Sequence, residues 1–528
     1  MKKTKQPKTS TATFVIGDAG LLRRNTCNYW EQFSHWFALI LLALFPLFPG
    51  TDGYYNITGT KDFVFKLLAI LFIVFCALIL AGLFLEKKLL RARAAGGWQR
   101  LTLPQILLMA YILWSALSAV LSPYPFAETW QGQGRTGGLF VILLYGAVFL
   151  LLSFWGEYSD RYTLALAAMA IVLGVMMVMQ IGGSTILYPE GMSYANTRFL
   201  GTIGNIDCVA GIVSVVAPAL ACGFVLLNTK WRYLCLPGFA MLLYTQLFMD
   251  VDTGKLGLAA ALVVVLPFLL TKRRNIADTL VVGAITAFIC SLHEALVYTR
   301  TVEETSATFT MTKTAWLMIA VAIVLLAVAA FLYWRDKKLG GKALPIKPKI
   351  IRLVVAAVEA VAIVAVLIFL YNYSGEHRLL VEISQMLHGE LSDSAGTGRG
   401  RVWKNCITFI RETPIIGSGP GTFAVRHAPF NTTQAFDFPH NDFLQIGVCQ
   451  GLVGLVLYVA FLVSLAVRVL KEAPRCPQIV IFIGAAVGYL VYSFFVFSIT
   501  IVSPLFWVMA GIMDKMVRQV EITEKQTA

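Results

Sequence analysis

The feature that most constrains this chain is the repetition of long apolar segments along its 528 residues. A hydrocarbon core about 30 Å thick is crossed by roughly 20 helical residues, and one segment after another approaches or exceeds that length. Mean hydropathy is +0.73, and only 14% of the residues are charged. A bilayer leaves no water for unpaired backbone groups, so such segments must be helical. We therefore predict an all-α integral membrane protein.

The apolar segments predict about fourteen transmembrane helices joined by one large loop and many short ones. The expected spans are 33–49, 63–85, 103–122, 138–155, 162–183, 204–227, 233–250, 256–270, 277–298, 314–333, 353–371, 442–467, 478–498 and 500–514. They divide the chain into an N-terminal bundle (1–371), a large loop (372–441), C-terminal helices (442–516) and a tail (517–528).

The distribution of basic residues predicts the orientation. With a cytoplasmic N-terminus, 30 of the 43 Lys and Arg residues fall in inside segments, 12 fall outside, and Lys66 lies in a span. Cytoplasmic loops carry such an excess for topological reasons. We therefore expect both termini in the cytoplasm and the large loop outside. The net charge of +14 is spread over many loops, which argues against a nucleic-acid partner.

The large loop is the expected functional segment, because connections of this length usually carry function. It holds four of the six histidines. "HRLLVEISQMLHGEL" and "RVWKNCITFIRE" have the apolar spacing of amphipathic helices. The glycine-rich stretch "PIIGSGPGTF" follows them and predicts a turn.

Isolated cations at the outer ends of spans predict an anion site. They are Arg135, Arg198, Lys255, Arg399 and Arg401. One outer arginine alone is usually an interfacial or packing residue, but several beside glycine-rich turns favour a polyanion. Guanidinium groups bind phosphate oxygens in pairs, and glycine turns let backbone N–H groups approach the same oxygens. A lipid-linked pyrophosphate fits this chemistry, with Gly417 and Gly419 as supporting residues.

His440 is the candidate catalytic residue. It stands in "FPHNDFLQIG", where the loop meets the next span. A lone histidine is often only a hydrogen-bonded loop residue, but an imidazole with a near-neutral pKa suits removal of a proton from a hydroxyl. Asn441 beside it is a candidate supporting residue.

A metal site is the alternative chemistry. Asp250 and Asp252 form a DxD at an outer span end, with Lys255 nearby, and Asp437 and Asp442 flank His440. The nine cysteines are scattered without a CxxC pair. We predict neither a metal nor another cofactor, while the DxD leaves the metal reading open.

These motifs together resemble the bacterial O-antigen ligase and polymerase superfamily. The resemblance is carried by "GQGRTGGLF", "RFLGTIGN", "GRGRVWKNCITFIRETPIIGSGPGTF" and "HNDFLQIGVCQGLVGL", in that order along the chain. "TGKLG" departs from the family's Ser-Arg-Gly, "GNID" matches its Asn-Pro-Asn only at Asn205, and Gln450 replaces a frequent glutamate.

The resemblance implies a glycosyltransferase C-like enzyme of the bacterial cytoplasmic membrane. Its donor would be a glycan on polyprenyl pyrophosphate, usually undecaprenyl, and transfer would occur outside without nucleotide sugar or metal. His440 would be the base, while Arg399 and Arg198 would bind the pyrophosphate. Arg135 is a weaker member of that set, and Lys255 is an approximate stand-in.

The sequence leaves the acceptor open. A ligase and a polymerase differ only in the acceptor, which could be a glycan, a lipid or a protein. A lipid-linked glycan flippase would instead need polar groups along a path through the spans and often an internal repeat. The concentration of polar residues in one outer loop favours the enzyme, and a membrane scaffold would leave the outer cations unexplained.

Overall fold

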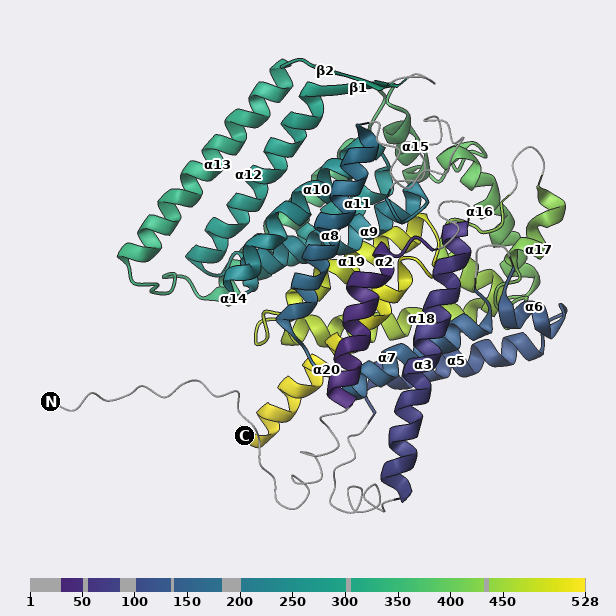
Figure 1. Ribbon diagram of the computed structural model, residues 1–528. Coiled ribbons are helices and arrows are strands. Elements are labelled where there is room, and N and C mark those ends of the chain that lie inside the picture. The colour runs from purple at the N-terminus through teal and green to yellow at the C-terminus, as the bar shows by residue number, and fades with distance from the viewer. Residues whose placement is uncertain are drawn as a thin grey trace.

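The computed structural model describes residues 30–50, 56–85, 101–133, 137–182, 201–300, 305–431 and 436–527. Helices dominate these residues, and one two-stranded hairpin is the only sheet among them (Figure 1). The predicted helical membrane class is therefore confirmed.

The N-terminal part begins with helical residues 30–39, which continue through a π-helical turn. Its elements are η1 (Ile40–Leu44), α2 (Phe45–Leu47), α3 (Ile57–Leu85), α5 (Leu103–Val120), α6 (Phe126–Gln131), α7 (Leu139–Trp155), α8 (Asp160–Ile181), α9 (Ile206–Leu226), η4 (Lys230–Leu234), α10 (Cys235–Met249) and α11 (Asp252–Leu269). The rest comprises α12 (Arg273–Ala295), β1 (Leu296–Arg300), β2 (Thr305–Phe309), α13 (Lys313–Lys338), α14 (Pro348–Tyr371), α15 (Arg378–Leu387), α16 (Ala395–Glu412), α17 (Phe423–His427), η5 (Ala428–Phe430), α18 (Asp442–Glu472), α19 (Ile479–Phe495) and α20 (Ser503–Thr527).

Every predicted span has a helix at its place. Among the described residues, nine helices are long and apolar enough to cross a membrane, namely α3, α5, α8, α9, α11, α12, α13, α14 and α18. α7 and α19 are shorter apolar helices. The first segment, α10 and α20 fall outside both groups, so a count of fourteen spans stays a prediction. α20 also continues to Thr527, through the residues that were expected to form a tail.

The core is built around α9. All 18 residues in the most apolar window of this helix are buried, and α8, α10, α11 and α19 pack against it. Small residues permit this close approach, since a Cβ on Gly488 would lie 1.7 Å from the carbonyl oxygen of Ser214. By contrast, α14 has no buried residue. The apolar surface of α14 is therefore suited to lipid.

A short β hairpin joins α12 to α13, and sequence analysis did not anticipate it. β1 pairs with β2 in antiparallel register from Leu296 opposite Phe309 to Arg300 opposite Thr305. Hydropathy alone extended the predicted span to residue 298, whereas the helix ends at Ala295. β-branched Val297, Thr299 and Thr305 favour the extended conformation at this point.

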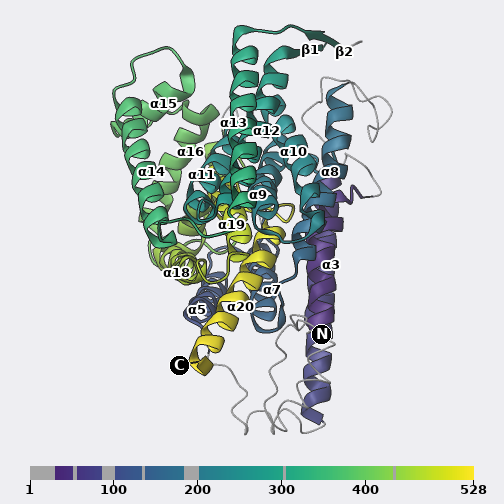
Figure 2. The same ribbon diagram turned by 90° about the vertical axis from the view of Figure 1, so that its left-hand side faces the viewer.

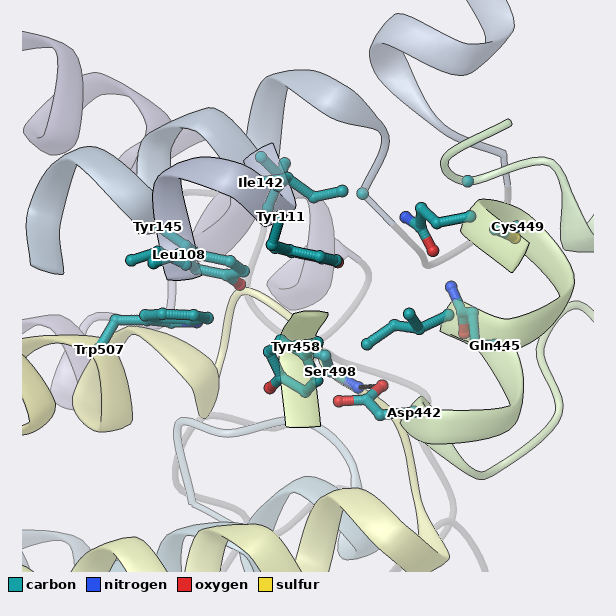
Figure 3. A pocket seen from close by; sticks show the side chains of 15 residues that line it. Leu108, Tyr111, Ile142, Tyr145, Asp442, Gln445, Cys449, Tyr458, Ser498 and Trp507 are labelled. Atoms are coloured by element: carbon teal, nitrogen blue, oxygen red, sulfur yellow. Dashed lines mark hydrogen bonds between the residues drawn. The ribbon is translucent and has the colours of Figure 1, made fainter. Parts of the chain in front are cut away.

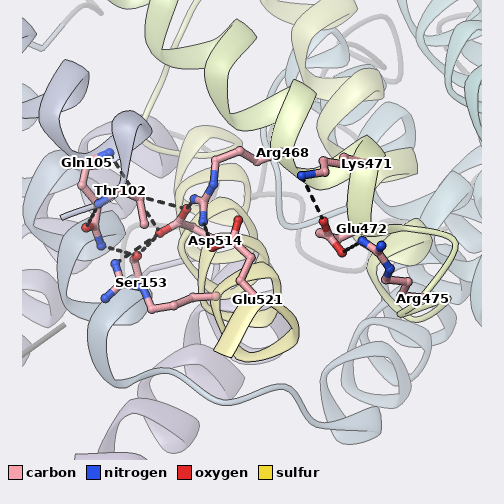
Figure 4. Close-up of polar contacts among 10 residues, drawn as sticks. Thr102, Gln105, Ser153, Arg468, Lys471, Glu472, Arg475, Asp514 and Glu521 are labelled. Carbon is pink, nitrogen blue, oxygen red and sulfur yellow. Dashed lines mark hydrogen bonds and ion pairs between the residues drawn. The ribbon is translucent and has the colours of Figure 1, made fainter. Parts of the chain in front are cut away.

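A buried polar network lies at one end of the molecule. α15 and the β hairpin lie at the end far from the last turns of α20 in both views (Figures 1 and 2). The end near α20 holds a buried polar network around Asp514 (Figure 4). Asp514 accepts hydrogen bonds from Arg468, Ser153 and Thr102. The network ties α5, α7, α18 and α20 together at that end.

Candidate functional site

The start of α18 places His440 and Asn441. Asn441 is the N-cap of α18, and its Oδ1 accepts the Leu444 backbone N–H at 2.9 Å. Asparagine is a favoured N-cap because its side chain satisfies an N–H that the helix leaves open. His440 precedes it with a φ of 52°, in the left-handed region. The predicted supporting role of Asn441 thus has a local basis: it fixes where the helix begins relative to His440.

The His440 imidazole lies in an aromatic surround. Its ring centroid is 4.4 Å from that of Phe438, 5.9 Å from Phe436 and 5.8 Å from Phe497. The His440 side chain stays partly exposed, whereas Phe438 and Phe497 are buried. The aromatic rings restrict the orientation of the imidazole and leave part of the side chain exposed.

α16 connects this surround to Arg399. Its residues Gly396, Thr397 and Gly398 have left-handed backbone angles, so the regular helix begins at Arg399. One turn later, the indole Nε1 of Trp403 donates to the carbonyl oxygen of Pro439 at 2.9 Å. Pro439 is the residue before His440. The structure therefore links the helix that begins at Arg399 to the residue before His440.

The guanidinium of Arg399 is available for an anion. Within the described part of the chain it forms no hydrogen bond or ion pair, and its side chain is partly buried. Burial lowers the pKa of Arg399, and the nearby carboxylate of Asp207 opposes that shift. The helix N-terminus adds partial positive charge at the same place. This combination suits a phosphate group.

Asn205 has the same local role as Asn441. It is the N-cap of α9, and its Oδ1 accepts the backbone N–H groups of Asp207 and Cys208 at 2.8 and 3.3 Å. Because Asp207 acts electrostatically on Arg399, the start of α9 lies near the start of the regular part of α16. The "RFLGTIGN" element thus ends at the N-cap of α9, and Asp207 in the first turn of that helix lies near Arg399.

The glycine-rich loop fills a break in α18. Gly451 has a φ of 70° and a ψ of −178°, which interrupts the helix. The carbonyls of Val448 and Cys449 accept the Ser418 and Gly419 N–H groups at 3.0 and 2.8 Å. Polar backbone released inside a membrane protein needs such partners. Three further hydrogen bonds satisfy backbone groups at the break. Trp114 Nε1 donates to the Gln450 carbonyl at 2.9 Å and Ser118 Oγ donates to the Cys449 carbonyl at 3.0 Å. The Leu452 N–H donates to the Pro414 carbonyl at 2.7 Å.

This geometry gives Gly417 and Gly419 a packing role. A Cβ on Gly417 would lie 2.5 Å from the carbonyl oxygen of Cys449, and one on Gly419 would lie 2.6 Å from Thr129 Cγ2. The N–H of Gly417 donates to Thr413 O at 3.1 Å, and that of Gly419 donates to Cys449 O. Both amides are therefore engaged within the chain, and the two glycines serve close backbone contact.

Lys255 is engaged with the DxD. It forms an ion pair with Asp250 and a second contact with Asp252 at 3.5 Å. The side chain of Asp250 is 80% exposed, so the cluster lies at the surface. One ammonium group and two carboxylates leave a net negative charge, which weakens the phosphate role expected of Lys255. The ammonium group would also compete with a metal ion for the carboxylates, which weakens the metal hypothesis. No group of three or more potential metal-ligating residues occurs in the described part of the chain.

Two predicted pyrophosphate ligands cannot be placed. Arg135 and Arg198 lie outside the described residues, and their roles stay predictions.

His427 is a structural histidine. It is 1% exposed, stacks on Phe423 with centroids 5.1 Å apart, and contacts Asn405 and Asn431 through its two ring nitrogens. Burial lowers the pKa of His427. Asn431 Oδ1 also accepts the Phe436 N–H at 2.9 Å, so this histidine braces the segment that leads to His440.

A pocket lies at the start of α18, where Asp442, two residues after His440, is part of its lining (Figure 3). Its walls come mainly from α5, α7, α18 and α20, and polar or aromatic members include Tyr111, Tyr145, Asp442, Gln445, Gln450 and Tyr458. Asp442 is 6% exposed and accepts the Ser498 N–H at 2.7 Å. Tyr145 stacks on Trp507 with ring centroids 5.6 Å apart.

Comparison with known families finds a match over a part of the chain that includes the large loop. Residues 305–459 match the sequence model of the family described as O-Antigen ligase. This part of the chain is similar to the O-antigen ligase family. The match includes Arg399, Trp403, the glycine-rich loop and His440. The resemblance inferred from the motifs is thus confirmed. No curated protein sequence matches the chain.

The described residues also hold nine helices long and apolar enough to cross a membrane, which fits a multi-pass membrane protein similar to the O-antigen ligase family. Sequence reasoning missed two parts of its site. Trp403 was recognised only as part of a sequence motif. Its hydrogen bond to Pro439 joins residues 36 positions apart, so the sequence alone did not indicate it. The pocket tyrosines had no signal at all, because α5, α7 and α18 meet only in the folded bundle.

Proposed function

We propose that this protein is a glycosyltransferase that moves a preassembled glycan from polyprenyl pyrophosphate, usually undecaprenyl pyrophosphate, to an acceptor outside the cytoplasmic membrane. The observation that carries the proposal is the arrangement on α16. Arg399, which forms no hydrogen bond or ion pair among the described residues, begins the regular helix. Trp403 one turn later donates a hydrogen bond to the residue before His440.

Arg399 would bind the donor pyrophosphate. Its guanidinium can form two parallel hydrogen bonds to phosphate oxygens, and the N-terminus of the helix favours the same charge. As the glycosidic bond breaks, negative charge grows on the leaving oxygen, and a fixed cation stabilises it without needing a proton. Arg198, Arg135 and, more weakly, Lys255 complete the proposed set.

His440 would act as the general base. Its imidazole would accept the proton of the acceptor hydroxyl while that oxygen forms a bond to the anomeric carbon. The bond from the anomeric carbon to the pyrophosphate oxygen breaks, and its electron pair leaves with polyprenyl pyrophosphate. A base with a pKa near the working pH is effective in such a step.

The test uses the purified full chain in lipid nanodiscs with a polyprenyl-pyrophosphate glycan and candidate acceptors. Arg399→Ala should raise the KM for the donor about 10- to 100-fold, because a charge-assisted contact contributes about 1.5–3 kcal/mol. Arg399→Lys should recover part of the loss, since it keeps the charge without the paired geometry. Arg411→Ala, in the last turn of the same helix, is the matched control.

Two further arms address the alternatives. Product analysis separates a longer lipid-linked glycan, which a polymerase would make, from a new conjugate made by a ligase. A chelator should leave turnover unchanged, and a loss would restore a metal role for Asp250 and Asp252. Full activity of Arg399→Ala would refute the pyrophosphate assignment.

A further inference from the structure

A second pocket lies at the end of α9 that is far from Asn205. Asn205 is the N-cap of this helix, whereas Leu226 in its last turn lines the pocket. The 21 residues of α9 rise about 30 Å, which separates the pocket from the neighbourhood of Arg399. The rest of the lining comes from the α11–α12 and α18–α19 connections, the adjoining helix ends and Arg352 near the start of α14. The orientation expected from the basic residues places this pocket at the cytoplasmic face.

Three cations line this second pocket, and among the described residues no carboxylate does so. The cations are Lys272, Arg274 and Arg352. The side chains of Lys272 and Arg352 form no hydrogen bond or ion pair within the described ranges. Three like charges around one hollow repel one another and favour an anion between them. We call this site the basic pocket.

Two acids near the basic pocket have partners of their own. Asp278, whose carboxylate lies 3.7 Å from Arg274, is fully buried and accepts two hydrogen bonds from Arg232 at 2.7 and 3.0 Å. Glu472 in the last turn of α18 pairs with Arg475 at 2.7 Å. Neither Arg232 nor Arg475 lines the basic pocket. The charge of the three lining cations is therefore not cancelled by these acids.

The start of α12 adds positive charge at the same place. Lys272 is the N-cap of this helix, and its side chain forms no capping hydrogen bond. The first backbone N–H groups of a helix carry partial positive charge and suit a phosphate group. Arg274 and Asn275 in the first turn also line the basic pocket. The helix end and the side chains thus favour the same ligand.

Apolar surface beside the cations indicates that the anion belongs to a lipid. Apolar side chains in the lining include Val225, Phe268 and Val480. α14, which carries Arg352, has no buried residue and lies along an outer edge of the bundle (Figure 2). Acyl chains can lie against this apolar helix while the phosphate stays between the cations. A free phosphate ion would leave the same apolar surface uncovered.

We propose that the basic pocket binds the phosphate headgroup of an anionic membrane phospholipid. Basic pockets between transmembrane helices on the cytoplasmic side recognise such headgroups. The bound lipid joins Arg352 on α14 to Lys272 at the start of α12, and it holds α14 against the bundle. This inference does not depend on the glycosyl-transfer reaction.

Two double variants test the charge of the basic pocket. Lys272→Gln with Arg352→Gln removes two lining cations. Lys337→Gln with Lys349→Gln removes the same charge from exposed residues that do not line the pocket and have the same expected side of the membrane. All four side chains are at least partly exposed, so both variants should unfold at the wild-type temperature in neutral detergent without lipid.

The binding experiment uses native mass spectrometry of the intact chain in neutral detergent, which counts the lipids bound during a titration. The probes are dioctanoyl phosphatidylglycerol, dioctanoyl phosphatidylcholine and glycerol phosphate. Phosphatidylglycerol should bind wild type at least about tenfold more tightly than phosphatidylcholine. The pocket variant should weaken phosphatidylglycerol binding about 30-fold, since each cation near the membrane surface contributes about 1 kcal/mol. The control variant should bind within twofold of wild type.

Three results of this titration would overturn the proposal. An equal loss in the control variant would mean that binding reflects general charge and not the basic pocket. Phosphatidylcholine binding as tight as that of phosphatidylglycerol would exclude recognition of an anionic headgroup. Glycerol phosphate, which has the headgroup phosphate without acyl chains, should bind about 100-fold more weakly because it buries no chain. Equal affinity for glycerol phosphate would assign the pocket to a soluble anion.

Nanodiscs provide the same test in a bilayer. A ligand that binds only the folded protein raises the unfolding midpoint. Replacing phosphatidylcholine by phosphatidylglycerol in the nanodisc should therefore raise the midpoint of wild type and of the control variant more than that of the pocket variant. An equal rise in all three proteins would contradict a bound lipid at the basic pocket.

Discussion

The indole Nε1 of Trp403 donates a hydrogen bond of 2.9 Å to the carbonyl oxygen of Pro439. This bond links the helix that begins at Arg399 to the residue before His440. His440 also has a φ of 52°, which is uncommon for a residue with a side chain. The contact with Trp403 is one reason that this backbone conformation is held.

Trp403→Phe tests that positioning role. The substitution keeps an aromatic ring near Phe494 and removes the donor to Pro439. We expect kcat for glycan transfer to fall about 10- to 100-fold, because a misplacement of about 1 Å can cost that much. The KM for the donor should change less than twofold. Initial rates over a range of donor concentrations measure both.

An exposed tryptophan provides the control for that variant. Trp334 is 56% exposed, and Trp334→Phe should be as active as wild type. A Trp403→Phe enzyme with wild-type kcat would show that the bond to Pro439 does not position His440.

Gly417→Ala tests the lock between the glycine-rich loop and the break in α18. Gly417 has a φ of +76°, and a Cβ there would lie 2.5 Å from backbone atoms of Cys449 and Gly451. The left-handed conformation costs roughly 1–2 kcal/mol and the overlap about 1–3 kcal/mol more. The midpoint of thermal unfolding in nanodiscs should therefore fall markedly.

Gly340 separates the two effects. Its φ is +61°, but no atom lies within 4 Å of an added Cβ. Gly340→Ala should show only the conformational cost, about 1–2 kcal/mol. Equal losses for the two variants would mean that the close contact of Gly417 is unimportant.

Asp514→Ala tests the polar network of Figure 4. Asp514 is fully buried, forms an ion pair with Arg468 and lies 3.9 Å from Arg518. Removing one member of a buried ion pair typically destabilises by about 3–5 kcal/mol, because it leaves the partner charge uncompensated. Glu521→Gln changes the other, 39% exposed partner of Arg468 and should cost at most about 1 kcal/mol. Denaturation midpoints should rank the variants in that order, and a mild Asp514→Ala would contradict the expectation.

His427 predicts a pH dependence of stability. Burial lowers its pKa below the ordinary value of 6.5. The unfolded chain therefore binds a proton at His427 at a higher pH than the folded chain does. The stabilisation is complete above about pH 6.5 and decreases as the pH falls from there toward the folded pKa. His427→Gln should flatten this part of the profile of unfolding midpoint against pH, whereas an unchanged profile would assign the dependence to another group.

Much of the bundle could be predicted because a membrane span has a simple signature. The apolar run over α9 and the two capping residues, Asn205 and Asn441, are local signals in the sequence. The break at Gly451 has no such signal, since the apolar pattern continues through it. Its partners come from residues far away in the chain, such as Ser118 and Trp114 on α5.

The candidate site was only partly predictable for the same reason. Residue type and motif order indicated Arg399 and His440, because guanidinium and imidazole groups have distinctive chemistry. The ion pair between Lys255 and Asp250 depends on how the lysine side chain is oriented. The spacing of the two residues in the sequence did not predict that orientation. The pocket tyrosines, Tyr111, Tyr145 and Tyr458, come together only when α5, α7 and α18 pack against one another.

The most direct test of the central claim is the kcat of glycan transfer from polyprenyl pyrophosphate by His440→Ala. His388→Ala is the matched control, because His388 lies in the same loop and stacks on Tyr371 with centroids 4.1 Å apart. Loss of a general base should lower kcat about 10²- to 10⁴-fold, while the control keeps wild-type activity. Equal, undiminished kcat values for both variants would contradict the assignment of His440 as the base.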